Sequence, residues 1–157
     1  MAHIINPGFN RHYPKRLIAR DPDNEDLIEQ LADIYYSLSD YARAEAFYKK
    51  VMEEGGDRDT IRKLAEVLIW QKKHDEGLTL LEDMIEEEPK DYAILEFYAD
   101  VSSWAGKYER SIDAYLKVLS AGEGNARTVL KLADTLRFAG RNEEAVKVYK
   151  DYLEEGE

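Results

Sequence analysis

The sequence predicts an all-α fold, an α-solenoid of stacked helical hairpins, and three observations support this prediction. One amphipathic pattern occurs four times along the 157 residues. Leucine-like residues that mark the copies lie 33, 34 and 34 residues apart, at Leu31, Leu64, Tyr98 and Leu132. Each copy also keeps two small positions, and small residues let two antiparallel helices approach each other closely.

The small positions indicate how each hairpin packs. The first position holds Ala32, Ala65, Ala99 and Ala133, and the second, twelve residues later, holds Ala44, Gly77, Ser111 and Ala145. Larger side chains are expected to close around the crossing, with Ile28, Ile61, Leu95 and Val129 before it and Tyr48, Leu81, Tyr115 and Tyr149 after it. One hairpin cannot bury its apolar face alone, so consecutive copies are expected to share a continuous core.

The individual helices follow from this periodicity in chain order. We expect helices near residues 25–38, 41–54, 58–71, 75–87, 92–105, 108–120, 126–139 and 142–155. Gly106 and Gly140 come directly after two of these segments, where a glycine in the left-handed conformation ends a helix. Gly77 lies inside an expected helix and weakens it by about 1 kcal/mol relative to alanine.

This spacing and residue choice resemble the tetratricopeptide repeat (TPR) family over residues 17–157. The family signature ends each repeat with a proline, which Pro22 and Pro89 match, whereas Gly56, Ser102 and Glu123 depart from the pattern. The resemblance implies a right-handed solenoid whose concave face is lined by the first helix of each pair. It also implies one array over 1–157, in which 1–24 is a partial preceding repeat or an N-terminal segment and the four repeats span 25–57, 58–91, 92–125 and 126–157.

Charge and composition limit the classes of partner. The formal net charge is −11, although the first 20 residues carry four basic side chains and no acidic one. The acidic remainder disfavours binding to nucleic acid and to anionic membranes. The chain has no cysteine, which excludes disulfides and thiolate chemistry. It has no apolar run near the roughly 18 residues of a membrane span and no visible signal peptide, and its compartment stays open between cytoplasm and periplasm.

The family resemblance implies that particular first-helix positions line the concave face. One position is acidic in every copy, at Asp33, Glu66, Asp100 and Asp134, and another is aromatic in three copies, at Trp70, Trp104 and Phe138. Tyr36, Ile69 and Arg137 complete the expected set. We expect these residues to bind a protein or peptide with a basic or aromatic patch. The alternative is that the acids are merely solvated and the aromatic rings pack between repeats.

Two comparisons within the family refine this expectation. Members that hold the C-terminal carboxylate of chaperones place Lys and Asn where this chain has Asp33 and Glu66, so acidic tails are not expected to bind. The stretch from Trp104 to Tyr108 resembles repeats of bacterial periplasmic arrays that serve exopolysaccharide export. That resemblance implies an alternative function, a scaffold that recruits a polymer-modifying enzyme or contacts the polysaccharide.

No pattern in the sequence predicts catalysis, a cofactor or a metal site. His3, His12 and His74 have no second ligand at metal-binding spacing. Gly122 and Gly124 lack the third glycine of a dinucleotide fingerprint and follow an expected helix. We therefore expect a non-enzymatic scaffold. Its ends carry no polar caps, which favours either an excised segment of a longer array or self-association through uncapped ends.

Overall fold

The computed structural model describes residues 24–154, which form eight α-helices and, within that range, no strand. This confirms the predicted all-α solenoid fold. The described residues fall into two compact units, with the boundary between Gln71 and Lys72. The expected N-terminal segment lies almost entirely outside the described residues. Among the helices of residues 24–154, none is long and apolar enough to cross a membrane.

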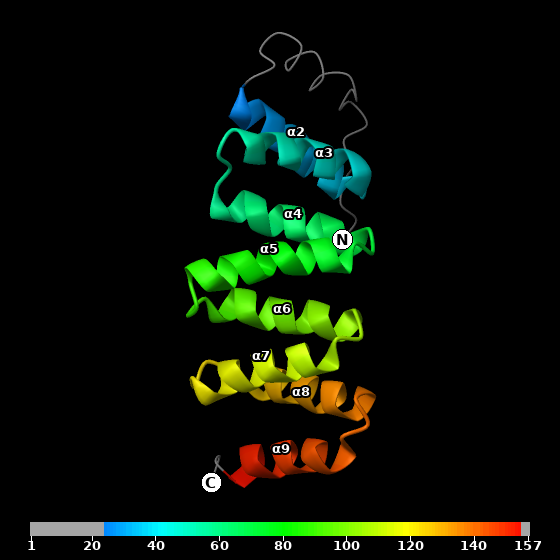
Figure 1. Cartoon of the computed structure of the whole chain (residues 1–157), viewed down its shortest axis with the longest axis vertical. Coiled ribbons are helices and arrows are strands. Elements are labelled where there is room, and N and C mark those ends of the chain that lie inside the picture. The colour runs from blue at the N-terminus through cyan, green and yellow to red at the C-terminus, as the bar shows by residue number, and fades with distance from the viewer. Residues whose placement is uncertain (1–23, 155–157) are drawn as a thin grey trace, which may run out of the picture. The chain divides into compact units, whose positions relative to one another are not determined.

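The first unit contains three helices, in which α2 packs against α3 and α3 against α4 (Figure 1). Each helix begins behind a side-chain cap, because the carboxylate or amide oxygens of Asn24, Asp40 and Asp57 accept hydrogen bonds from backbone N–H groups of the first turn. The helix bounds are Glu25–Ser37 for α2, Tyr41–Glu53 for α3 and Arg58–Trp70 for α4.

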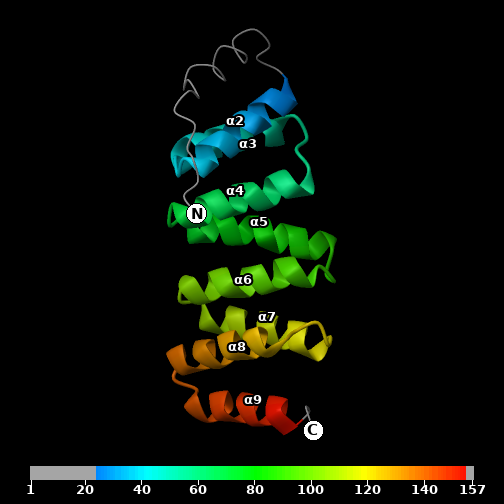
Figure 2. The same ribbon diagram turned by 180° about the vertical axis from the view of Figure 1, so that it is seen from behind.

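The second unit contains five helices, and each packs against the next along the chain, as the view from behind also shows (Figure 2). Asp91 and Asn125 cap α6 and α8. The bounds are His74–Glu87 for α5, Tyr92–Trp104 for α6, Tyr108–Ser120 for α7, Ala126–Phe138 for α8 and Asn142–Glu154 for α9. All eight helices begin and end within one residue of the predicted limits.

The small positions lie at the most buried points of the helices. The four alanines of the first position, Ala32, Ala65, Ala99 and Ala133, are all 0% exposed. At the second position Ala44 and Ser111 are also 0% exposed, and Gly77 is buried. In the second unit Ile112, Tyr115 and Leu132 share one apolar cluster with Ala99 and Ala133. Fully burying one such large side chain contributes about 1.5–3 kcal/mol.

The turn that follows the first helix of each repeat contains one residue in the left-handed conformation. Its left-handed residue is Gly106 with φ 73° and Gly140 with φ 77°, as the sequence predicts. The equivalent residues in the first two copies are Ser39 with φ 57° and Lys72 with φ 66°. Residues with a side chain rarely adopt this conformation, so Ser39 and Lys72 make the first two turns less favourable locally than the glycine turns.

Two leucines in α8 test whether burial explains the stability of this unit. Leu132 is 0% exposed and Leu130 is 53% exposed. We expect Leu132→Ala to lower the free energy of unfolding by about 2–5 kcal/mol, because it removes buried methyl groups and leaves a cavity. Leu130→Ala is the matched control and should cost less than about 0.5 kcal/mol. Urea unfolding followed by circular dichroism measures both, and equal losses would contradict the described core.

Candidate functional site

Asp33, the first predicted site residue, is held by side chains from α3 and α4. The Tyr48 hydroxyl donates a hydrogen bond to Asp33 Oδ1 at 2.5 Å, and Lys63 Nζ lies 3.2 Å from the same oxygen. Lys63 also contacts Glu29 on α2 at 3.0 Å. One lysine of the second repeat therefore pairs with two carboxylates of the first, and the charge of Asp33 is compensated inside the protein.

The second unit repeats this arrangement around Asp100. Its carboxylate accepts a short hydrogen bond from the Tyr115 hydroxyl and pairs with Lys131 Nζ at 2.7 Å, and Lys131 also contacts Glu96 at 3.3 Å. We call these two sets the lysine networks. The first comprises Glu29, Asp33, Tyr48 and Lys63, and the second comprises Glu96, Asp100, Tyr115 and Lys131.

The lysine networks shift the pKa values of their own members. Burial raises the pKa of Tyr48 and of Tyr115 far above the usual tyrosine value, and the hydrogen bond to the neighbouring carboxylate raises each pKa further. Burial alone would lower the pKa of Lys63, but hydrogen bonds to Glu29, Asp33 and Asp59 outweigh that effect and raise it. At neutral pH both tyrosines are therefore neutral donors and Lys63 is a cation.

The two remaining predicted carboxylates also have donors inside their own unit. Glu66 accepts a hydrogen bond from the Tyr36 hydroxyl at 3.1 Å and forms a short ion pair with Arg62. Asp134 pairs with Arg137 at 2.9 Å, and both side chains are more than half exposed. Every acid that the sequence singles out thus has an intramolecular partner, which reduces the charge available to a ligand.

The aromatic positions differ from the acidic ones because they remain open to solvent. Trp70 is 53% exposed, Trp104 57% and Phe138 68%. Two of these rings rest on a tyrosine that begins the second helix of the preceding repeat. Trp70 stacks on Tyr41 with ring centroids 6.4 Å apart, and Phe138 stacks on Tyr108 at 6.3 Å. Each stack leaves part of the ring available for contact.

Ile69 differs from its neighbour Trp70 although the two are adjacent in α4. The Ile69 side chain is only 4% exposed and belongs to the core. Successive residues of a helix point about 100° apart, so a surface position can be followed or preceded by a buried one. Ile69 therefore offers no surface to a partner, unlike the other residues of the predicted set.

A shallow cleft of about 550 Å³ lies beside the Trp70 ring in the first unit. Leu38, which is 55% exposed, contributes an apolar wall, and Tyr36 meets Tyr41 edge-on at 6.0 Å. The cleft can accept an apolar or planar group against Trp70. Its lining residues are Leu38, Ser39, Asp40, Tyr41, Ala42, Trp70 and Gln71.

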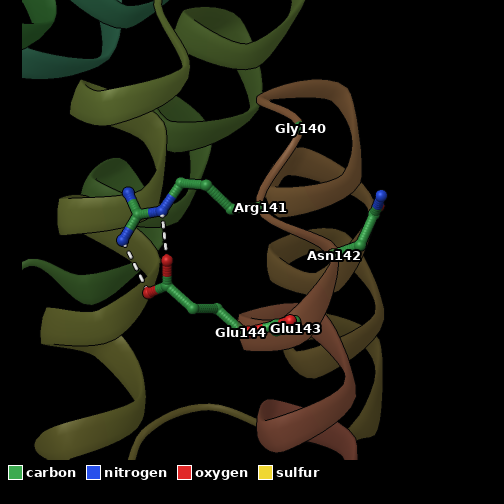
Figure 3. Close-up of a pocket in the computed structure, with 5 residues that line it drawn as sticks. All are labelled: Gly140, Arg141, Asn142, Glu143 and Glu144. Atoms are coloured by element: carbon green, nitrogen blue, oxygen red, sulfur yellow. Dashed lines mark hydrogen bonds and ion pairs between the residues drawn. The ribbon is translucent and has the colours of Figure 1, made fainter.

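A second hollow, of about 390 Å³, lies at the turn between α8 and α9 and is lined by Gly140, Arg141, Asn142, Glu143 and Glu144 (Figure 3). The Arg141 guanidinium donates to both carboxylate oxygens of Glu144 at 2.6 and 2.7 Å and to Glu109 on α7 at 2.7 Å. These bonds lower the pKa of Glu144 and tie α9 to α7. Within residues 24–154 no group of His, Asp and Glu side chains is arranged to hold a metal.

Sequence reasoning missed the lysines and the stacking tyrosines because they recur every second repeat rather than every repeat. Lys63 and Lys131 are 68 residues apart, and Tyr41 and Tyr108 are 67 residues apart. The third repeat has Phe97 where the second and fourth have these lysines. An alignment of alternate copies, instead of all four copies together, would have revealed this period.

The second lysine network predicts an energetic coupling between Asp100 and Lys131. Both side chains are mostly buried, with relative exposures of 19% and 26%. We expect the Asp100→Asn and Lys131→Met substitutions to be non-additive by about 1 kcal/mol in a double-mutant cycle measured by urea unfolding. The control cycle combines Asp100→Asn with Lys147→Met, because Lys147 is an exposed residue of α9. If the losses of unfolding free energy caused by Asp100→Asn and Lys131→Met simply add in the double variant, the ion pair contributes nothing to stability.

The raised pKa values of Tyr48 and Tyr115 predict a loss of stability in alkali. Each tyrosine keeps its proton in the folded chain above pH of about 10, where the unfolded chain releases it, so the free energy of unfolding should fall as the pH rises. The Tyr48→Phe, Tyr115→Phe double variant should show a shallower fall between about pH 9 and 11 in urea unfolding. Tyr152→Phe is the exposed control. If the free energy of unfolding of the double variant falls with pH as steeply as that of the parent chain, Tyr48 and Tyr115 do not cause the loss of stability in alkali.

Comparisons with known proteins place this geometry in a family. Two family models, both described as tetratricopeptide repeat, match residues 37–101 and 104–157. A crystal structure of MamA is 20% identical, with a TM-score of 0.76, over 90% of this chain and 78% of MamA. MamA from Desulfovibrio magneticus RS-1 is 17% identical, with a TM-score of 0.76, over 91% of this chain and 81% of that one.

A third solved structure is YrrB, described as a TPR protein with an unusual peptide-binding site. It is 15% identical, with a TM-score of 0.75, over 90% of this chain and 74% of YrrB. At these identities the likeness shows a shared fold. No curated protein matches the sequence significantly. The two family models together span most of the residues, and the chain therefore belongs to the tetratricopeptide repeat family.

Proposed function

We propose that this chain is a non-enzymatic interaction scaffold that binds a protein or peptide partner through the face of its first helices. The observation that carries the proposal is the repeated exposure of a large aromatic ring at one repeat position, at Trp70, Trp104 and Phe138. Aromatic side chains supply much of the binding energy at protein interfaces. We further propose that residues 25–57, 58–91, 92–125 and 126–157 act as four repeats of one array.

The charges of the chain favour a basic partner with aromatic or apolar side chains. The net charge of −11 would speed the encounter with a cationic surface, an effect that weakens at high ionic strength. The close contacts would come from the rings rather than from the acids, because Asp33, Glu66, Asp100 and Asp134 already have donors within the chain. A guanidinium or ammonium group over Trp70 or Trp104 would contribute about 0.5–2 kcal/mol.

A second candidate is a scaffold of a bacterial exopolysaccharide system. The exposed rings favour this candidate as well, because the flat faces of Trp70 and Trp104 can stack on sugar rings. A cationic polymer would suit the negative net charge better than a neutral one. The two candidates use the same surface and differ in the ligand, so one binding experiment can separate them.

We expect a labelled peptide of alternating arginine and tryptophan to bind the chain. The double variant Trp70→Ala, Trp104→Ala should bind this peptide with an affinity at least about tenfold lower. Fluorescence anisotropy measures the affinity. Leu116→Ala is the matched control, because Leu116 is 47% exposed but lies on the second helix α7. Trp70→Ala alone removes the stack on Tyr41 and should cost about 0.5–1.5 kcal/mol of stability, so thermal unfolding accompanies each measurement.

Two further ligands decide between the candidates. A peptide with glutamate in place of arginine should not bind, because the negative chain repels it. A glucosamine hexamer should bind more weakly than the basic peptide if the partner is a protein. Binding that the double tryptophan variant retains in full would overturn the proposed surface, and preference for the glucosamine hexamer would favour the polysaccharide candidate.

A further inference from the structure

The stacked rings recur once in each unit rather than once in each repeat. In the first unit Trp70 stacks on Tyr41, with ring centroids 6.4 Å apart and an interplanar angle of 17°. In the second unit Phe138 stacks on Tyr108 at 6.3 Å and 28°. We call these the first and the second ring pair. The repeat between them has His74, the first residue of α5, in place of the tyrosine, so the ring pairs follow a period of two repeats.

The helices that carry the two exposed rings are held by the same contacts in both units. Thr60 of α4 donates a hydrogen bond to Glu29 on α2 at 3.5 Å, and Thr128 of α8 donates one to Glu96 on α6 at 3.2 Å. The two lysine networks join the same helices, α4 to α2 and α8 to α6. Each ring pair therefore has its own supporting contacts, all of which lie within its own unit.

The surroundings of the first ring pair suit a cationic side chain. Among the described residues that line the cleft beside Trp70, Asp40 is the one that carries a charge. Its partner Arg43 lies 2.5 Å away and is 57% exposed. Exposed ion pairs are weak, so a ligand cation can compete with Arg43 for this carboxylate. The indole ring of Trp70 is also the aromatic surface that attracts a cation most strongly.

We propose that the chain is bivalent, and that each ring pair is a separate binding site for a short segment in which an arginine adjoins an aromatic residue. One chain would then hold two such segments. In the second unit Trp104 ends α6 and Tyr108 begins α7, so Trp104 borders the second ring pair across the turn of residues 105–107. The inference rests on the proposed function and adds the number and the position of its sites.

The two sites should differ in their affinity for a cation. Arginine binds more weakly over a phenyl ring than over an indole ring, which disfavours Phe138 relative to Trp70. The position of Asp40 is also occupied in the second unit by Lys107, which pairs with Asp75 at 2.9 Å. We expect the first site to bind an arginine-containing peptide several-fold more tightly than the second. Phe138→Trp should reduce this difference.

Fluorine NMR can observe the two sites separately, because the chain has two tryptophans and each unit contains one of them. The full chain is labelled with 5-fluorotryptophan, and Trp104→Phe assigns the two resonances. The probe is the unlabelled peptide acetyl-Gly-Arg-Trp-Gly-amide, which carries the proposed segment once. Both resonances should shift and saturate during the titration. Equilibrium dialysis at saturation should give about two peptides per chain.

Single substitutions should remove one site at a time. Tyr41→Ala removes the ring beneath Trp70, so it should abolish the shift of the Trp70 resonance and preserve that of Trp104. Phe138→Ala should have the opposite effect, and each variant should bind about one peptide. Leu130→Ala is the matched control, because Leu130 is 53% exposed on the same helix as Phe138. It should leave both shifts unchanged.

Circular dichroism checks that the helices of each variant are intact. If Tyr41→Ala fails to fold, Asp40→Asn takes its place, because asparagine also caps a helix and only the charge is lost. Asp40→Asn should lower the affinity measured at the Trp70 resonance and leave that measured at the Trp104 resonance unchanged.

Two results would overturn bivalence and leave the proposed function standing. The first is a single bound peptide per chain with a shift of only one resonance. The second is the loss of both shifts in Tyr41→Ala or in Phe138→Ala alone, which would indicate one continuous site. A parent chain that binds no peptide and shows no shift of either resonance would count against the proposed function itself.

Discussion

The close packing of helices at the alanine positions is the constraint on which the rest of the structure depends. Ala32, Ala65, Ala99 and Ala133 have no exposed surface, and in the second unit Ile112, Tyr115 and Leu132 share one apolar cluster with Ala99 and Ala133. Because interiors are packed as densely as organic crystals, a larger side chain at such a point would have to displace its neighbours. The same close approach brings Tyr48 and Tyr115, each 1% exposed, near the first helix of their own repeat, where their hydroxyls meet Asp33 and Asp100.

This packing gives the lysine networks their structural role. A buried tyrosine hydroxyl without a partner would cost about 1–3 kcal/mol, and the aspartate supplies the acceptor that avoids this cost. The aspartate would then leave a partly buried negative charge, which the lysine of the next repeat offsets. The two lysine networks thus link the first repeat to the second and the third repeat to the fourth. The aromatic rings at the ends of α4, α6 and α8 are left as the most exposed large apolar side chains of these first helices.

Much of the fold could be predicted from the sequence because its signals are local and repeated. The helix limits follow from the periodicity and from caps such as Asp57 and Asn125, and the burial of Ala99 follows from its position in the repeat. The partners of the acids could not be predicted in this way. Asp33 meets Tyr48 and Lys63, which are 15 and 30 residues away, so their contact depends on how hairpins stack. The resemblance to the family likewise placed Ile69 among the surface positions, whereas tertiary packing buries it.

The most direct test of the central constraint compares two alanines in α3. Ala44 is 0% exposed and occupies the second small position, whereas Ala46 is exposed in the same helix. Replacing each by leucine changes helix propensity equally, so only the packing differs. Urea unfolding should show a loss of about 1–3 kcal/mol or more for Ala44→Leu and less than about 0.5 kcal/mol for Ala46→Leu. Equal stability of the two variants would contradict the claim that small side chains set the approach of the helices.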